Sequence, residues 1–265
     1  MTNIVRRQLE RNAVFLFVVT LVLAGFEFVL CAVVASMDTE AALGQMTAFA
    51  PPLLRAMIEQ NMPGGSPAGV LSFGWNHPIA HALLGAVAIT LAARAIAGEI
   101  ETGAIELVMA QPISRTGYFA AHVSFGAGAI AAVLAGGLLG TALGQQVFSL
   151  NAFGMERLAA LFLNAFVLQL AIYALTLAAS AAGREAGRAA LVGVLFTVLS
   201  FLVNVIAALW DKASFAKPWS LHAYYDPREI LTQGHLPASS VLILAVFSAV
   251  AMTAAFVRFL RRDLP

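Results

Sequence analysis

The chain has 265 residues, of which 60% are hydrophobic and 11% are charged, and its formal net charge is +1. So much apolar surface cannot be buried in one water-soluble core. The composition therefore excludes a soluble globular protein and predicts an integral membrane protein, with a single membrane domain over residues 1–265.

Long apolar segments indicate that the chain crosses the membrane as helices. A helix needs roughly 20 residues to span about 30 Å of hydrocarbon, whereas barrel strands are shorter and alternate between polar and apolar residues. The helical requirement is met by six segments: 13–37, 78–97, 119–144, 158–182, 189–210 and 239–259. The sequence therefore predicts an all-α fold with six transmembrane helices.

The region before the first span is basic and amphipathic. Residues 1–12 are predicted to form a short amphipathic entry helix, with its arginines at the lipid headgroups and three apolar residues toward lipid, namely Ile4, Val5 and Leu9. A cleaved signal peptide is the alternative. However, the apolar run that follows is longer than the usual core of roughly 7–15 residues in such a peptide.

The first span carries one acidic residue, Glu27, about halfway along its length. A charge at that depth costs roughly 2.5–3.5 kcal/mol, so the side chain is expected to face protein or water. It is a candidate substrate or proton contact; the alternative is a protonated or hydrogen-bonded contact between helices. Cys31 in the same span is the chain's one cysteine, so no intramolecular disulfide is expected.

Two histidines, His77 and His81, lie four residues apart at the start of the second predicted span. This spacing places both imidazoles on one helical face and makes them candidate metal ligands, although zinc sites usually have three or four ligands. The alternative is that Asn76 or His77 caps the helix that Pro78 begins. His222 and His235 lie in the later outer loop and would be further ligands.

A charged segment, GEIETGAIELVMAQPISR at residues 98–115, separates the second and third spans. We call this segment the elbow. On a helix, one stripe of the elbow is apolar and contains Ile100, Ala104, Leu107 and Val108. Another face is acidic and contains Glu99 and Glu106, which are seven residues apart. Pro112 is expected to end this helix and Ser114 to cap the next one. The elbow is interpreted either as a docking helix or as a solvated loop that reverses the chain.

Small residues recur every four positions in the third span: Gly128, Ala132, Gly136, Gly140 and Gly144. On a helix they share one face, where another backbone can approach closely. The pattern predicts close packing inside the bundle or a contact between subunits.

Basic residues indicate the orientation of the chain in the membrane. Ten of the fifteen fall on the side of the termini and the elbow: Arg6, Arg7, Arg11, Arg94, Arg115, Arg184, Arg188, Arg258, Arg261 and Arg262. Because positively charged loops stay in the cytoplasm, both termini and the elbow are predicted to be cytoplasmic.

Motifs for catalysis are missing from the sequence. It contains no G-x-S-x-G, no H-E-x-x-H and no phosphate-binding loop, since Lys212 and Lys217 both follow residues other than glycine. No catalytic residue is therefore predicted, and the chain is not expected to hydrolyse ATP alone.

The order of residues in the elbow resembles that of permeases of type-2 ATP-binding-cassette (ABC) transporters. These permeases carry E-x-E-x-G-x-x-E-x-x-x-x-x-P-x-S-R, matched here by Glu99, Glu101, Gly103, Glu106, Pro112, Ser114 and Arg115. A second stretch, HAYYDPREILTQG at 222–234, is similar to the segment that precedes their last span. The chain departs from the family pattern at Ile100 and His122, where relatives often have basic residues.

The resemblance implies the type-2 ABC exporter permease fold in a bacterial inner (plasma) membrane. It implies a second permease, either a copy or a homologue, and two cytoplasmic ATPase subunits that bind ATP and Mg, with no cofactor on this chain. The motif residues would couple ATP hydrolysis to transport: Glu99, Glu101, Gly103, Glu106, Pro112 and Arg115.

Two alternatives remain open from the sequence. One is an ABC-type complex that assembles or remodels an extracytoplasmic accessory protein bound to the long outer loops. The other is a membrane-embedded enzyme that would use Glu27 and the outer histidines. Nucleic acid is not expected as a partner.

Overall fold

The computed structural model describes residues 2–36, 44–45, 47–51, 55 and 66–262. Within these residues, six helical segments are long and apolar enough to cross a membrane, as the sequence predicts. Five are single helices: α1 (Thr2–Ser36), α8 (Arg115–Val147), α9 (Met155–Ala182), α10 (Ala186–Leu209) and α11 (Ala238–Arg261). Their bounds agree with the predicted spans to within a few residues, except at the start of α1.

The second span is built from consecutive pieces: α4 (Pro67–Trp75), α5 (Pro78–Ala93), the π-helical turn η2 (Arg94–Gly98) and α6 (Glu99–Glu101). It starts at Pro67, so the prediction that it begins at Pro78 is wrong. Ser66 caps α4 by accepting a hydrogen bond from Gly69 N, and the apolar residues Leu71 and Trp75 of α4 are buried. Pro78 interrupts the span because its ring fits only the first turn of a helix.

The N-terminal region is helical and belongs to the same helix as the first span, because α1 continues without a break from Thr2. One stripe of buried residues runs along the whole helix: Ile4, Gln8, Asn12, Val19, Leu23, Glu27, Cys31 and Val34. The prediction that Ile4 faces lipid is therefore wrong, whereas Leu9 is exposed. A packed stripe of this length fixes the first turns in line with the rest of α1.

Glycines of α8 allow α1 to pack closely against it. A Cβ on Gly140 would overlap the backbone oxygen of Ala24, and one on Gly144 would lie 2.7 Å from Cys31. Gly136 likewise faces Thr20. Close packing inside the bundle is thus confirmed for these three glycines, but a methyl group added at Gly128 would have no neighbour within 4 Å.

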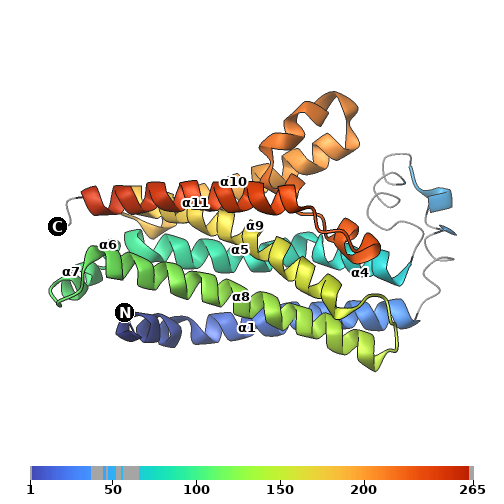
Figure 1. The fold of residues 1–265 in the computed structure, drawn as a ribbon, viewed down its shortest axis with the longest axis horizontal. Helices are drawn as coiled ribbons and strands as arrows, with labels where there is room; N and C mark the ends of the chain where they lie inside the picture. Colours follow the sequence, from blue (N-terminus) through green and yellow to red (C-terminus); the bar gives the residue numbers. More distant parts are fainter. Residues whose placement is uncertain (1, 37–43, 46, 52–54, 56–65, 263–265) are drawn as a thin grey trace.

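The helices form a bundle whose long axes run roughly together (Figure 1). The N-terminus, the C-terminal end of α11 and the helices α6 and α7 (Ala104–Met109) all lie at one end, which we call the elbow end. The opposite end, called the far end, carries three short helices between α10 and α11: η3 (Asp211–Trp219), η4 (Leu221–Tyr224) and η5 (Glu229–Gln233). This arrangement puts the start of α1 and the end of α11 beside the elbow.

The contact between α1 and α8 gives a matched test of the fold. Gly140→Ala should lower the free energy of unfolding by about 1–3 kcal/mol, because the methyl group meets backbone atoms that cannot rotate away. Gly128→Ala in the same helix should leave stability unchanged or slightly raised, since alanine favours helix and meets nothing. Thermal unfolding of the two purified variants in detergent measures the difference, and equal melting temperatures would contradict this packing.

Candidate functional site

The elbow is bent into two short helices. Gly103 separates α6 from α7 and has a φ of 69°, in the left-handed region that glycine adopts without strain. The predicted continuous stripe is therefore wrong. Ile105 and Val108 anchor α7 in the core, whereas Leu107, predicted to be part of the apolar stripe, is 74% exposed.

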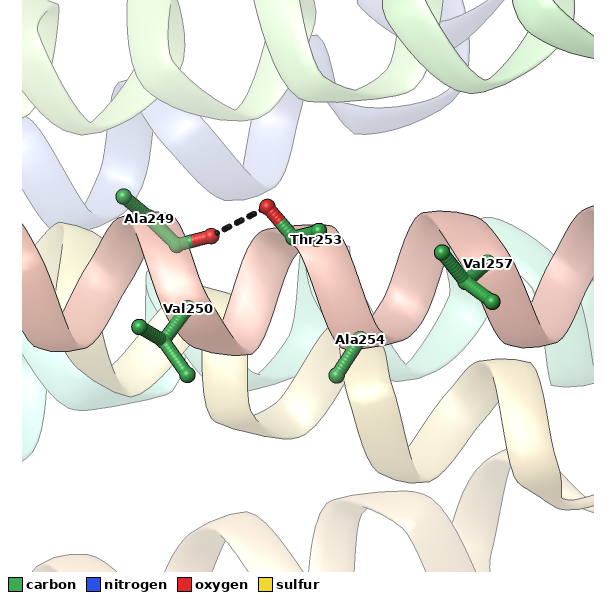
Figure 2. Close-up of a pocket in the computed structure, with 5 residues that line it drawn as sticks. All are labelled: Ala249, Val250, Thr253, Ala254 and Val257. Atoms are coloured by element: carbon green, nitrogen blue, oxygen red, sulfur yellow. Dashed lines mark hydrogen bonds between the residues drawn. The ribbon is translucent and has the colours of Figure 1, made fainter.

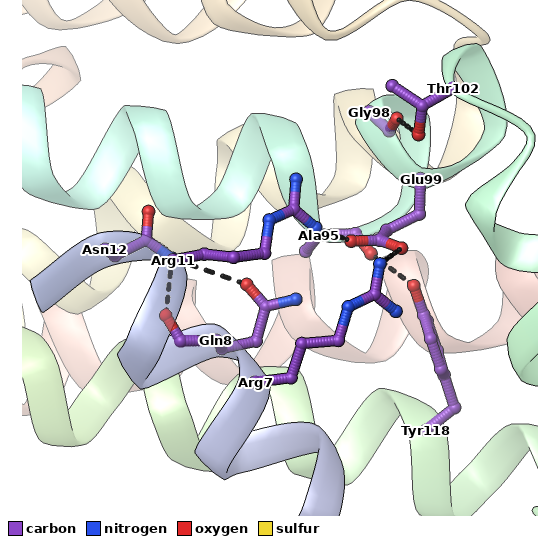
Figure 3. Close-up of polar contacts among 9 residues, drawn as sticks. All are labelled: Arg7, Gln8, Arg11, Asn12, Ala95, Gly98, Glu99, Thr102 and Tyr118. Carbon is purple, nitrogen blue, oxygen red and sulfur yellow. Dashed lines mark hydrogen bonds and ion pairs between the residues drawn. The ribbon is translucent and has the colours of Figure 1, made fainter.

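Glu99 is the buried centre of the elbow end. Its side chain is almost fully buried, and its two oxygens pair with Arg7 and Arg11 of α1, the former at 3.2 Å (Figure 3). The two arginines lie one helical turn apart, so both guanidinium groups reach the same carboxylate. Beside this pair, the Tyr118 hydroxyl donates to the carbonyl of Ala95 at 2.7 Å. Glu99 thus links the second span to α1, and it does not share an exposed face with Glu106.

Glu101 connects the elbow to α10. Its Oε2 accepts a hydrogen bond of 2.8 Å from the backbone N–H of Ala186, the first residue of that helix. The first N–H groups of a helix have no partner within it, and the helix dipole favours a negative charge there. Glu101 therefore caps a helix from a different part of the chain.

Arg115 connects the end of the elbow to α11. Its guanidinium donates to the carbonyl oxygens of Leu260 and Arg262, at 3.0 Å and 2.6 Å. Arg262 in turn donates to the carbonyls of Ala181 and Gly183 at the end of α9. The carbonyls that end α9 and α11 are thereby satisfied by side chains.

Ser114 begins α8 at the end of the elbow. Its side chain caps the helix by accepting a hydrogen bond of 3.0 Å from Gly117 N, as the sequence predicts. The elbow therefore ends in a fixed helix start.

A second set of elbow residues faces outward. Glu106 and Pro112 are exposed together with Leu107, and among the described residues the Glu106 carboxylate makes no hydrogen bond or ion pair. The elbow motif therefore divides into two groups. Glu99, Glu101 and Arg115 bind other helices of the same chain, whereas Glu106 and Pro112 are available to a partner.

Comparison with models of protein families matches residues 11–264 to the one described as ABC-2 family transporter protein. The chain belongs to this family. Its resemblance to type-2 ABC permeases is thus confirmed. The protein is a membrane subunit of an ABC transporter. Such a subunit works with an ATP-binding subunit and is not itself the ATPase. A search of curated proteins finds no match.

Glu27 of this permease faces protein, as predicted, and is fully buried. The Thr141 hydroxyl of α8 lies 3.4 Å from Glu27 Oε2, and the indole of Trp75 donates to the same hydroxyl at 3.2 Å. Gly74 leaves room for the carboxylate, since a Cβ there would lie 3.3 Å from Oε2. Oε1 has no hydrogen-bond partner in the described structure. These contacts fit a hydrogen-bonded link between helices, and a substrate or proton role stays a prediction.

His77 and His81 of the permease have different surroundings. His77 caps α5 by accepting from Ile79 N at 3.2 Å, which confirms the capping prediction for this residue. His81 lies 3.3 Å from Asn76 Oδ1 and packs edge-on against His222. Among the described residues, no group of three or more histidine, cysteine, aspartate or glutamate side chains has a geometry that would hold a metal ion.

The second motif of the permease, at 222–234, folds against the far end of the bundle. The Tyr225 hydroxyl donates to the carbonyl of Trp75 at 3.1 Å, and Arg157 of α9 donates to the carbonyl of Leu231 at 2.7 Å. Asn164 adds a hydrogen bond to the carbonyl of Tyr224. The motif therefore ties η4 and η5 to the second and fourth spans.

An apolar groove of about 500 Å³ follows the surface of α11, along Ala249, Val250, Thr253, Ala254 and Val257. The Thr253 hydroxyl donates to the carbonyl of Ala249 within the same helix (Figure 2). The groove thus has few polar atoms that a ligand could bind. Its small side chains suit contact with lipid or with another helix.

The link between Glu99 and the two arginines gives a prediction about stability. Glu99→Gln should lower the free energy of unfolding by about 1–2 kcal/mol, because the arginines lose a charged partner but are nearly half exposed. Glu106→Gln, which makes the same change on an exposed residue of the elbow, should have no effect. Chemical unfolding of the purified chain measures both.

A double-mutant cycle separates this link from a general effect of the substitution. Arg11→Gln combined with Glu99→Gln should cost less than the sum of the single changes, since each removes the same interaction. Additive effects would show that the two side chains do not interact.

Proposed function

We propose that the chain couples ATP hydrolysis by separate ATPase subunits to export of a substrate across the membrane. The observation that carries this proposal is the division of the elbow. One set of its residues is bonded to other transmembrane helices, and another set is exposed for a partner.

The exposed part of α7 is the proposed docking surface for an ATPase subunit. Leu107 is a large apolar side chain that is 74% exposed, and Glu106, which precedes it in the chain, is also exposed. An apolar side chain next to charge is typical of a small docking surface, in which the apolar group is buried by the partner and the charge sets orientation. The buried side chains of Ile105 and Val108 hold α7 against the bundle, so the proposed partner would bind a helix whose position is fixed.

Motion of α7 would be transmitted to three other helices through the polar contacts of the elbow. Glu99 pairs with arginines of α1, Glu101 accepts a hydrogen bond from the start of α10, and Arg115 donates to carbonyls at the end of α11. Each contact is charged on at least one side and therefore stronger than a neutral hydrogen bond. Displacement of the elbow by nucleotide-driven closure of the ATPases would thus reposition these helices together and alternate the exposure of the transport path.

The π-helical turn η2 suits this role because it precedes the elbow directly. Its widened backbone is satisfied by Ser180 of α9, whose hydroxyl oxygen accepts from Ala97 N at 2.8 Å and donates to the carbonyl of Ala93 at 2.9 Å. Such turns occur frequently at functional sites and are a defined place for a helix to bend.

The complete transporter is proposed to contain a second permease, either a copy or a homologue, and two ATPase subunits that bind ATP and Mg. The proposed location is a bacterial inner membrane with both termini in the cytoplasm. The common position of the termini and the elbow in the bundle supports this orientation, as do the arginines at that end. The apolar residues exposed on α10 leave a surface for lipid or for the second permease.

The docking surface is tested by adding a charge to it. Leu107→Glu should prevent an ATPase subunit with a phosphate-binding loop from copurifying with the tagged chain, and should lower the ATPase activity of the preparation by at least about tenfold. Thr116→Glu, on the exposed first turn of α8, adds the same charge nearby and should leave both measurements unchanged. Retention of a fully active ATPase by the Leu107→Glu variant would rule out this surface.

A further inference from the structure

The apolar groove on α11 ends at two arginines. The residues that line it, drawn in Figure 2, are all exposed, whereas the buried residues of α11 lie on another face of the helix. Arg258 follows the groove residue Ala254 by four positions, and Arg261 follows Val257 by four, so each arginine lies about one turn beyond the groove. Both arginines are exposed. An apolar surface therefore passes directly into a positively charged one at the elbow end of α11.

The charge of these two arginines is not balanced by a neighbour. Among the described residues, no ion pair or side-chain hydrogen bond involves Arg258 or Arg261. Arg262 donates only to carbonyl oxygens at the end of α9, which carry no net charge. Burial, and then the positive charges of Arg184 and Arg258, lower the pKa of Arg262, so these cations lie close enough to repel one another. We call Arg184, Arg258, Arg261 and Arg262 the arginine cluster.

Acidic residues do not cancel the charge of the arginine cluster. Glu185, in the loop that ends α9, pairs with Arg188 at 2.8 Å. Asp263 follows the cluster in the sequence and lies outside the described residues. Counting Asp263 against the four arginines of the cluster still leaves a net positive charge. An anion beside the cluster would therefore relieve repulsion between its members.

We propose that the groove and the arginine cluster bind an anionic membrane phospholipid. The headgroup lies against Arg258 and Arg261, and an acyl chain lies along the groove. The dimensions fit, because residues 249–257 cover about 12 Å of helix, most of the roughly 15 Å of hydrocarbon in one leaflet. The hydroxyl in the groove, that of Thr253, already donates to the carbonyl of Ala249, so the acyl chain meets no polar group that needs water.

A second copy of the chain fits this surface less well than a lipid. Two copies related by a two-fold axis along the membrane normal, and meeting through α11, would bring the same residues of that helix together. Arg258 and Arg261 of one copy would then face those of the other, and like charges repel. A lipid phosphate brings the opposite charge to the same place.

The inference goes beyond the proposed coupling function, since lipid binding requires neither nucleotide nor an ATPase subunit. It has a consequence for the elbow end nonetheless. Arg115 donates to the carbonyls of Leu260 and Arg262, so a lipid at this site would hold the helix end to which the elbow is bonded.

The test compares ligands that differ in one property each. The purified full chain in neutral detergent is titrated with phosphatidylglycerol, with phosphatidylcholine of the same acyl chains, and with glycerol 3-phosphate, and bound ligand is counted by native mass spectrometry. Phosphatidylglycerol should bind at least about fivefold more tightly than phosphatidylcholine, and glycerol 3-phosphate should not bind in the same range. Equal binding of the two lipids would overturn the role of the arginines. Equally tight binding of glycerol 3-phosphate would overturn the role of the groove.

Matched arginine variants locate the headgroup. Arg258→Gln should weaken phosphatidylglycerol binding about fivefold, the effect expected of one cation near a lipid headgroup. Arg94→Gln removes an exposed arginine of η2, which likewise makes no ion pair among the described residues, and should leave binding unchanged. Replacing both Arg258 and Arg261 by Gln should remove the preference for phosphatidylglycerol over phosphatidylcholine. Equal affinities of the Arg258→Gln and Arg94→Gln variants would overturn the proposal.

Tryptophan variants locate the acyl chain. Ala254→Trp fills the groove and should weaken binding of both lipids at least about fourfold, the cost of exposing one methylene group. Val198→Trp, on the exposed surface of α10, adds the same side chain elsewhere and should have no effect. Both substitutions lie on exposed surfaces, so the fold should tolerate them. A dimer that Ala254→Trp dissociates while lipid binding stays unchanged would show that a second copy occupies the groove, and would overturn the proposal.

A further variant separates this inference from the proposed coupling function. Leu107→Glu changes only the elbow and should bind phosphatidylglycerol like the unchanged chain. Loss of ATPase activity with intact lipid binding would support both proposals. Intact coupling to the ATPase, together with no preference of the unchanged chain for phosphatidylglycerol, would overturn the lipid site alone.

Discussion

The ion pair between Glu99 and the arginines of α1 determines the arrangement of the elbow end. A carboxylate that is almost fully buried must be paired, since leaving it alone would cost several kcal/mol. Arg7 and Arg11 meet this requirement only if α1 extends as one helix to the level of the elbow. The straight start of α1, the burial of Ile4 and the position of the second span are therefore connected through one carboxylate.

The elbow motif gains a physical explanation from these contacts. Its residue types suit bonds within the chain: Glu101 meets a helix start, where negative charge is favoured, and Arg115 meets a helix end, where positive charge is favoured. Gly103 permits the bend that points α6 and α7 in different directions. A motif that first suggests contact with a partner thus has most of its charged residues bonded to other helices of the same chain, and the proposed partner surface lies among its exposed residues, on α7 and at Pro112.

The sequence predicts the fold well because apolar length and charge asymmetry are local properties. All six spans, the caps at Ser114 and His77 and most of the glycine face of α8 can be predicted from neighbouring residues. Contacts between distant segments cannot be predicted in this way. In the sequence, Arg7 and Arg11 indicate only the orientation in the membrane, and nothing shows that they pair with Glu99. Helical spacing alone also places Glu99 wrongly on one face with Glu106.

Polar groups at the two ends of the bundle have different consequences. At the elbow end, Glu99 and Arg262 have their bonds within the chain, so movement of one helix must move others or break charged contacts. At the far end, the ring nitrogen Nε2 of His222 lacks a partner among the described residues. Satisfied groups fix the relative positions of helices, whereas an unsatisfied group holds no neighbour in place. The bonded groups at the elbow end are what the proposed coupling role requires, because they make several helices move together.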